Sequence, residues 1–213
     1  MMQSRAMSGA GYLFSLLYFL KFVIGDIFPR TLNILCLMNL NDFIPFNPLM
    51  DSGRSIPERP GNYIVTIRDI DALPTLGHKI VTRHFNGQEI IYTGISKKNL
   101  YKRIWKSHIG GHAGRSTLRL TIGCLFGYTL IPRDKHDPNN GKVRFCPDDE
   151  RELRTWMKEN LVFYILPNDS PKELETELIE MFNPPLNLDE CANPVNQEFR
   201  SNLTCLRGQR PWK

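Results

Sequence analysis

Two short runs of β-branched and aromatic residues constrain the fold of this 213-residue chain more than any other feature. The first run, at 61–67, reads GNYIVTI, and the second, at 89–94, reads EIIYTG. The second follows Asn86-Gly87, a dipeptide that favours the type I′ turn of a β-hairpin. Such composition is typical of strands packed in a sheet. We therefore predict strands at 61–67, 89–94 and 161–166, with a short additional strand at 79–82.

Capping residues and helical periodicity predict helices after these strands. Ser96 is a candidate N-cap for a helix that Gly110-Gly111 would end. Ser170 and Pro171 begin a capping box with proline at the first helical position. The predicted helices cover 97–109, 117–125, 147–159, 170–182 and 193–207. The fold class is therefore α+β, with a small, mainly antiparallel three-stranded sheet flanked by helices.

The first 51 residues are predicted to be an apolar N-terminal extension, and residues 52–213 one domain with a C-terminal closing helix. Residues 11–28 are strongly apolar, but Lys21 and Asp26 interrupt a stretch that falls short of the roughly 20 apolar residues of a membrane span. Three explanations stay open: an extension upstream of a true start at Met38, a secretory signal, and a membrane anchor. The upstream extension is favoured, so we expect a cytoplasmic protein without a membrane partner.

Positive charge is concentrated in one part of the chain. The net charge is +5, and residues 90–133 contain eight Lys or Arg residues with no Asp or Glu. This distribution favours a basic face and an anionic partner. The five cysteines are scattered and form no CxxC pair, which argues against a disulfide framework or a structural zinc site. No glycine-rich phosphate loop is present, so we expect no nucleotide cofactor.

One glutamate in the predicted helix 170–182 stands out by its position. The apolar arc of this helix consists of Leu174, Leu178, Ile179, Met181 and Phe182. Glu175 falls within that arc, whereas Glu173, Glu177 and Glu180 fall on the side expected to face solvent. A carboxylate directed toward a core is costly without a cation, a metal ion or hydrogen bonds. The pattern therefore predicts a specific partner for Glu175.

In this order along the chain, these residues resemble the GIY-YIG nuclease family. Gly61-Asn62-Tyr63 begins the first run, and Tyr92-Thr93-Gly94 ends the second. The resemblance spans about 61–187. His108 follows Arg103 shortly after in the predicted helix, and in this feature the chain resembles the restriction-enzyme branch of the family. The chain departs from the family at Asn62 and Thr93, which are expected to point away from the site, and at Ile95, where some repair-type members have lysine. The resemblance implies six catalytic residues: Tyr63, Tyr92, Arg103, His108, Glu175 and Asn187.

The resemblance also implies a chemistry, the metal-dependent hydrolysis of DNA phosphodiester bonds. Glu175 would hold Mg²⁺ or Mn²⁺, hard cations that prefer oxygen ligands. Arg103 would stabilise charge that develops on the phosphate, because a planar guanidinium matches phosphate oxygens. Tyr63 would orient or deprotonate the attacking water. Tyr92 and His108 would relay a proton or contact phosphate, and Asn187 would organise the site by hydrogen bonds.

DNA phosphates are expected to contact the basic segment. The candidate substrate-binding residues are Lys97, Lys98, Lys102, Lys106, Arg115 and Arg119. An ordinary solvated helix face remains the alternative for Lys98, Lys102 and Lys106. At the level of function, a restriction-type endonuclease is favoured. A structure-selective repair nuclease and a DNA-binding module without activity are the alternatives, and a homodimer stays open.

Overall fold

The computed structural model describes residues 40–189 and 191–211, within a compact unit that spans Leu40–Lys213. The apolar segment 11–28 and the alternative start at Met38 lie outside the described residues. Within the described part of the chain, no helix has the length and hydropathy needed to cross a membrane.

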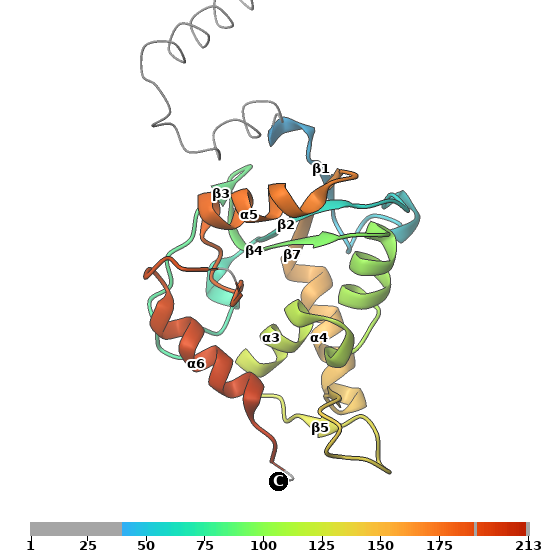
Figure 1. Ribbon diagram of the computed structural model, residues 1–213, viewed down its shortest axis with the longest axis vertical. Coiled ribbons are helices and arrows are strands. Elements are labelled where there is room, and N and C mark those ends of the chain that lie inside the picture. The colour runs from blue at the N-terminus through green and yellow to red at the C-terminus, as the bar shows by residue number, and fades with distance from the viewer. Residues whose placement is uncertain (1–39, 190, 212–213) are drawn as a thin grey trace, which may run out of the picture. The chain divides into compact units, whose positions relative to one another are not determined.

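A five-stranded antiparallel sheet forms the centre of this unit, with the strand order β1-β7-β2-β4-β3 (Figure 1). Its strands are β1 (Ile44–Phe46), β2 (Gly61–Ile67), β3 (His84–Phe85), β4 (Gln88–Ser96) and β7 (Leu161–Pro167). The three predicted long strands are confirmed as β2, β4 and β7. The prediction of only three strands is wrong, because β1 and β3 add two short edge strands. Strands of two or three residues are too short for a periodic sequence pattern.

Strand β1 joins residues of the predicted N-terminal extension to the sheet, because Ile44 pairs with Ile165 of β7. The compact unit spans Leu40–Lys213. The sequence 44–46 contains Pro45, which weakens a strand signal.

The predicted hairpin is confirmed between β3 and β4. Asn86 and Gly87 both have positive φ angles, 47° and 79°, as a type I′ turn requires. The short strand predicted at 79–82 is absent. Instead, the side-chain amide of Asn196 bonds both backbone groups of Val81: its Nδ2 donates to the carbonyl and its Oδ1 accepts from the N–H. This segment is therefore held by a side chain rather than by a neighbouring strand.

The helices lie on both faces of the sheet. They are α3 (Thr117–Leu125), α4 (Pro147–Asn160), α5 (Pro171–Phe182), α6 (Gln197–Gly208) and a π-helix η5 (Lys102–Ile109), with short 3₁₀ turns η2 (Leu40–Asp42), η3 (Gly53–Ser55), η4 (Ile70–Ala72) and η6 (Ala113–Arg115). Figure 1 shows α5 over one face and α3 and α4 over the other. Every residue of β2 is buried, as expected for a strand covered on both faces. A two-stranded hairpin of β5 (Ile131–Pro132) and β6 (Val143–Arg144) lies apart from the main sheet.

The helix ends agree only in part with the predicted caps. Pro171 lies in the first turn of α5, as predicted, but the Ser170 side chain makes no capping hydrogen bond. Ser96 does bond a backbone N–H, that of Asn99, at 2.9 Å. The closing helix starts at Gln197 rather than at 193, and Leu203 is fully buried in the core.

Candidate active site

The two motif tyrosines lie next to each other because of the register between β2 and β4. Tyr63 lies opposite Gly94, and Val65 lies opposite Tyr92, so both rings extend from the same face of the sheet. The ring centroids are 6.3 Å apart. A Cβ at position 94 would lie 2.5 Å from the Tyr63 Oη and 2.9 Å from the Tyr92 ring. Glycine at this position therefore makes the space in which the two phenols meet.

The π-helical winding of η5 places Arg103 and His108 on the same tyrosine. The Arg103 Nε–H donates to Tyr63 Oη at 3.3 Å, and His108 Nε2 lies 2.8 Å from the same oxygen. In an α-helix, residues five apart point about 140° away from each other. In a π-helix, the hydrogen bonds run between residues five apart, so Arg103 and His108 lie one above the other. The helix predicted at 97–109 is therefore a π-helix over Lys102–Ile109 rather than an α-helix. This winding brings Arg103 and His108 together at Tyr63.

Ser116 extends this contact into a chain of hydrogen bonds. Its Oγ lies 2.6 Å from His108 Nδ1 and accepts the backbone N–H of Arg119 at 3.0 Å. Both Ser116 and His108 are buried. Either tautomer of neutral His108 can make both hydrogen bonds: Tyr63 O–H donates to Nε2 while Nδ1–H donates to Ser116 Oγ, or Ser116 O–H donates to Nδ1 while Nε2–H donates to Tyr63 Oη. Ser116 was not among the predicted site residues; its position just before α3 marks it as an N-cap, but its contact with His108 comes only from the fold.

Burial controls the ionisation of these groups. Loss of hydration raises the pKa of Tyr63 well above its usual value, and Tyr92 raises it further, while the charge of Arg103 opposes both. Burial also raises the pKa of Tyr92. The pKa of His108 is well below its usual value because of burial and the nearby charges of Arg103 and Arg119. At neutral pH the site therefore contains two neutral phenols, a neutral imidazole and a guanidinium cation.

Glu175 lies on helix α5, within electrostatic range of the two tyrosines. Its charge contributes to the raised pKa values of both Tyr63 and Tyr92. The carboxylate is 17% exposed and accepts a hydrogen bond from Lys172 Nζ at 3.1 Å. The predicted need for a partner is met within the chain by Lys172. Glu175 is thus a partly accessible carboxylate whose charge acts on both phenols.

The solvent-facing position predicted for Glu177 is wrong. Glu177 is 6% exposed, and its Oε2 has no hydrogen-bond partner among the described residues. Burial, followed by repulsion from Glu173 and Glu180, raises its pKa. The sequence pattern predicts that only one face of α5 is covered by the protein. In the structure the buried residues of α5 extend around a wider arc of the helix, which includes Glu177.

Asn187 supports the strand that carries Tyr92. Its Oδ1 accepts the Thr93 N–H at 2.9 Å, and its Nδ2 donates to the Thr93 carbonyl at 3.0 Å. Leu186 continues the pattern, because its N–H donates to the Ile91 carbonyl. The amide of Asn187 therefore takes the place of a neighbouring strand on the open edge of β4. Its contacts fix the backbone between Tyr92 and Gly94 rather than reach the phenols.

Glu175 is also the group available for a metal ion. Across residues 40–189 and 191–211, no three or more His, Cys, Asp or Glu side chains gather into a metal cage. Magnesium commonly binds through one or two carboxylates, with waters and substrate phosphates completing its shell. A single carboxylate beside the phenols fits that arrangement. These residues therefore fit a hard divalent cation shared between Glu175 and a phosphate.

Most of the predicted substrate-binding cations are exposed. Lys97, Lys98, Lys102, Lys106 and Arg115 all have exposed side chains. The Arg103 guanidinium lies 3.5 Å from the Arg115 carbonyl, so Arg115 adjoins the cluster of Tyr63, Arg103 and His108. These five positions stay candidates for phosphate contacts.

Arg119 is a correction, because it cannot contact DNA in this fold. Its side chain is fully buried and its Nε lies 2.6 Å from Glu150 Oε2. Its Nη1 donates to the carbonyls of His108 and Ile109, and its Nη2 to the carbonyl of Glu150. A count of charges along the sequence does not reveal which cations are inside. Arg119 instead holds the end of η5, and with it His108, against α4.

Comparison with known proteins agrees with this geometry. The model of the family described as the GIY-YIG catalytic domain matches residues 61–209, which cover β2 to α6. No curated protein and no solved structure matches the chain at a significant level. The matched segment contains all six residues proposed as catalytic, and its two tyrosines, arginine and histidine meet in the cluster described above. This chain belongs to the GIY-YIG nuclease superfamily.

Proposed function

We propose that this protein is a divalent-metal-dependent DNA endonuclease of the restriction type. Membership of the family supports a nuclease. The observation that carries the finer proposal is the Tyr63 Oη, held between Arg103 Nε and His108 Nε2 beside the charge of Glu175. A buried catalytic hydroxyl with a neutral imidazole on one side and a fixed cation on the other is suited to activating water next to a phosphate.

The phenol of Tyr63 would act through His108 rather than as a free phenolate. Because the pKa of Tyr63 is raised, it starts as a neutral hydroxyl. As water attacks phosphorus, one water proton passes to Tyr63 Oη while the phenol proton passes to His108 Nε2, with Nδ1–H donating to Ser116 Oγ. The low pKa of His108 opposes the imidazolium in the empty site, and the negative charge of a bound phosphate offsets this cost.

The other residues would stabilise the charge and fix the geometry. Arg103 would donate from its remaining N–H groups to the non-bridging oxygens of the phosphate. Asn187 would keep Tyr92 and Gly94 in register by completing the open edge of β4. The bond from phosphorus to the leaving oxygen breaks, and that oxygen takes up a proton from solvent. A metal ion held by Glu175, when bound, would neutralise a phosphate oxygen and assist the leaving group.

Plasmid cleavage by the full chain tests this function. With Mg²⁺ or Mn²⁺ we expect nicked and linear DNA, and with EDTA we expect intact supercoiled plasmid. Discrete fragments from linear DNA would support a restriction-type enzyme. Cutting only at flaps or junctions would favour a structure-selective repair nuclease. Salt-sensitive DNA binding without any cleavage in either metal would contradict the proposal and favour a binding module.

A further inference from the structure

The β5–β6 hairpin begins at the end of the basic segment 90–133 and extends its positive charge to Arg144. It has an open hollow of about 420 Å³, lined by Arg133, Asp134, Lys135, His136, Lys142 and Arg144. Within the described part of the chain, no ion pair is recorded for the four Lys and Arg residues of this hollow. The Arg144 Nε is buried and has no hydrogen-bond partner among the described residues. The hollow therefore brings the four Lys and Arg side chains together around one carboxylate, that of Asp134.

The acidic residue in the hollow serves the loop rather than the cations. Asp134 Oδ1 accepts the backbone N–H groups of His136 and Asp137, and Oδ2 accepts from Asn140 Nδ2. These bonds give the loop between β5 and β6 a fixed turn. Arg133 N–H donates to the Lys142 carbonyl at 2.9 Å, which holds the two sides of the hairpin together. Asp134 thus shapes the loop on which the lysines are displayed.

The hairpin is connected to the active site by a short series of contacts. The catalytic Arg103 donates to the Arg115 carbonyl in η6, and the neighbouring Gly114 packs directly against the Val143 carbonyl in β6. Burial lowers the pKa of the nearby His112 and the charge of Glu150 opposes this, while the charges of Arg115, Arg133 and Arg144 lower the pKa further. These three guanidinium groups therefore lie within electrostatic range of the same imidazole. Arg115 thus lies between Arg103 and the cations of the hairpin.

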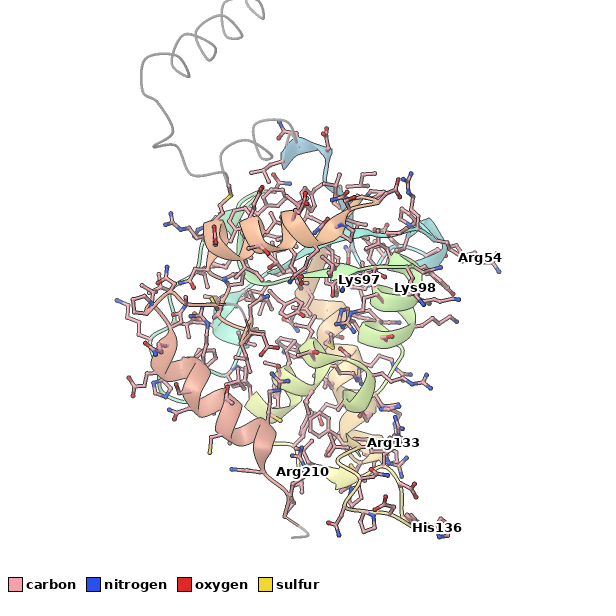
Figure 2. All side chains as sticks on the ribbon, in the orientation of Figure 1. Arg54, Lys97, Lys98, Arg133, His136 and Arg210 are labelled. Carbon is pink, nitrogen blue, oxygen red and sulfur yellow. The ribbon has the colours of Figure 1, made fainter. Side chains whose placement is uncertain are left out.

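We infer that the β5–β6 hairpin binds the DNA backbone beside the cleaved phosphate. In Figure 2, Lys97 and Lys98 are labelled near the middle of the unit, and Arg133 and His136 are labelled toward its lower end. A line of cations that extends past a catalytic centre fits a polyanion with evenly spaced charges better than it fits a single small anion. The partner is duplex DNA, whose flanking phosphates the hairpin would contact without reading bases. This inference rests on the proposed function, since it concerns DNA bound at the same site.

The salt dependence of duplex binding tests the inference. The double variant Lys135→Gln/Lys142→Gln removes two exposed charges of the hairpin. The matched control, Lys79→Gln/Arg83→Gln, removes two exposed charges from the segment before β3. Affinity for a duplex is measured in EDTA, where no cleavage is expected, over a range of salt concentrations. Two lost phosphate contacts should reduce the slope of log K against log salt by about 1.8, and the control should leave the slope unchanged.

The outcomes separate this inference from the proposed function. A smaller slope only in the hairpin variant, with loss of hydroxyl-radical protection on one flank of the bound site, would support it. An unchanged slope, or equal reductions in both variants, would overturn it, because the hairpin would then contribute nothing or only net charge. If the hairpin variant behaves as expected but the unaltered protein never cuts with metal, the nuclease proposal fails, and the hairpin is a DNA-backbone contact of a binding protein. If the unaltered protein cuts and the slopes do not differ, the hairpin inference fails alone.

Discussion

Replacing Tyr63 by phenylalanine is expected to slow single-turnover DNA cleavage by about 10²–10⁴-fold, the range lost when a general acid–base group is removed. The phenylalanine ring would still fill the space between Tyr92 and Phe163. The centroid of the Tyr63 ring lies 6.3 Å from the centroid of each of these two rings. What disappears is the hydroxyl that links Arg103 to His108. DNA affinity in EDTA should therefore change little while the rate of cleavage falls.

The control for this variant is Tyr164→Phe. Tyr164 is also a buried strand tyrosine, but its hydroxyl lies 3.5 Å from Gln88 Oε1, away from the catalytic cluster. Its removal should leave the rate within about twofold of the unaltered protein, as expected for the loss of one weak contact. A Tyr63→Phe protein that folds and cuts at the rate of the Tyr164→Phe protein would contradict the role given to Tyr63.

Replacing Arg119 by leucine is expected to lower the free energy of unfolding by about 3–5 kcal/mol, the usual cost of breaking a buried ion pair. Glu150 would lose its partner at 2.6 Å, and the carbonyls of His108 and Ile109 would lose a donor. Because these carbonyls end η5, the catalytic histidine should also lose its fixed position. Denaturant unfolding measures the first effect, and the cleavage rate of the folded fraction measures the second.

Two further variants show whether this cost comes from the buried pair. Arg115→Gln removes an exposed charge of the same basic segment and should change stability by less than about 0.5 kcal/mol. Arg119→Leu combined with Glu150→Leu should recover part of the loss, since no unpaired charge is left. A stable Arg119→Leu protein with weakened DNA binding would instead restore Arg119 as a phosphate contact.

The sheet and the tyrosine pair were predictable because their signals are local. The run 61–67, the run that contains Tyr92 and the turn at Asn86-Gly87 each specify a backbone geometry from neighbouring residues alone. Once the two runs pair, strand alternation directs Tyr63 and Tyr92 to one face. The sequence does not predict the short edge strand β1 or the β5–β6 hairpin. Strands of two or three residues are too short to show the alternation of apolar and polar residues that marks a strand.

The assembly around Tyr63 was only partly predictable, because it depends on tertiary contacts. Arg103 and His108 were expected on a helix of ordinary winding, where they would diverge, and nothing local in that sequence indicates the π-helical form. Ser116 could be identified as an N-cap, but its bond to His108 links two separate elements. Arg119 is counted with the surface cations in the sequence, because a charge count does not show which side of α3 each residue faces.

The most direct test of the central claim is plasmid cleavage by Glu175→Gln beside Glu173→Gln, in Mg²⁺ and in Mn²⁺. Both residues lie on α5, but only Glu175 is partly buried beside the phenols, whereas Glu173 is exposed. We expect the Glu175 variant to lose cleavage by about 10³-fold or more, if its carboxylate holds the metal ion that assists phosphodiester hydrolysis. The Glu173 variant should cut like the unaltered protein, and both should bind DNA in EDTA. Equal cleavage by the two variants would contradict a catalytic centre built from Glu175 and the Tyr63–His108–Arg103 cluster.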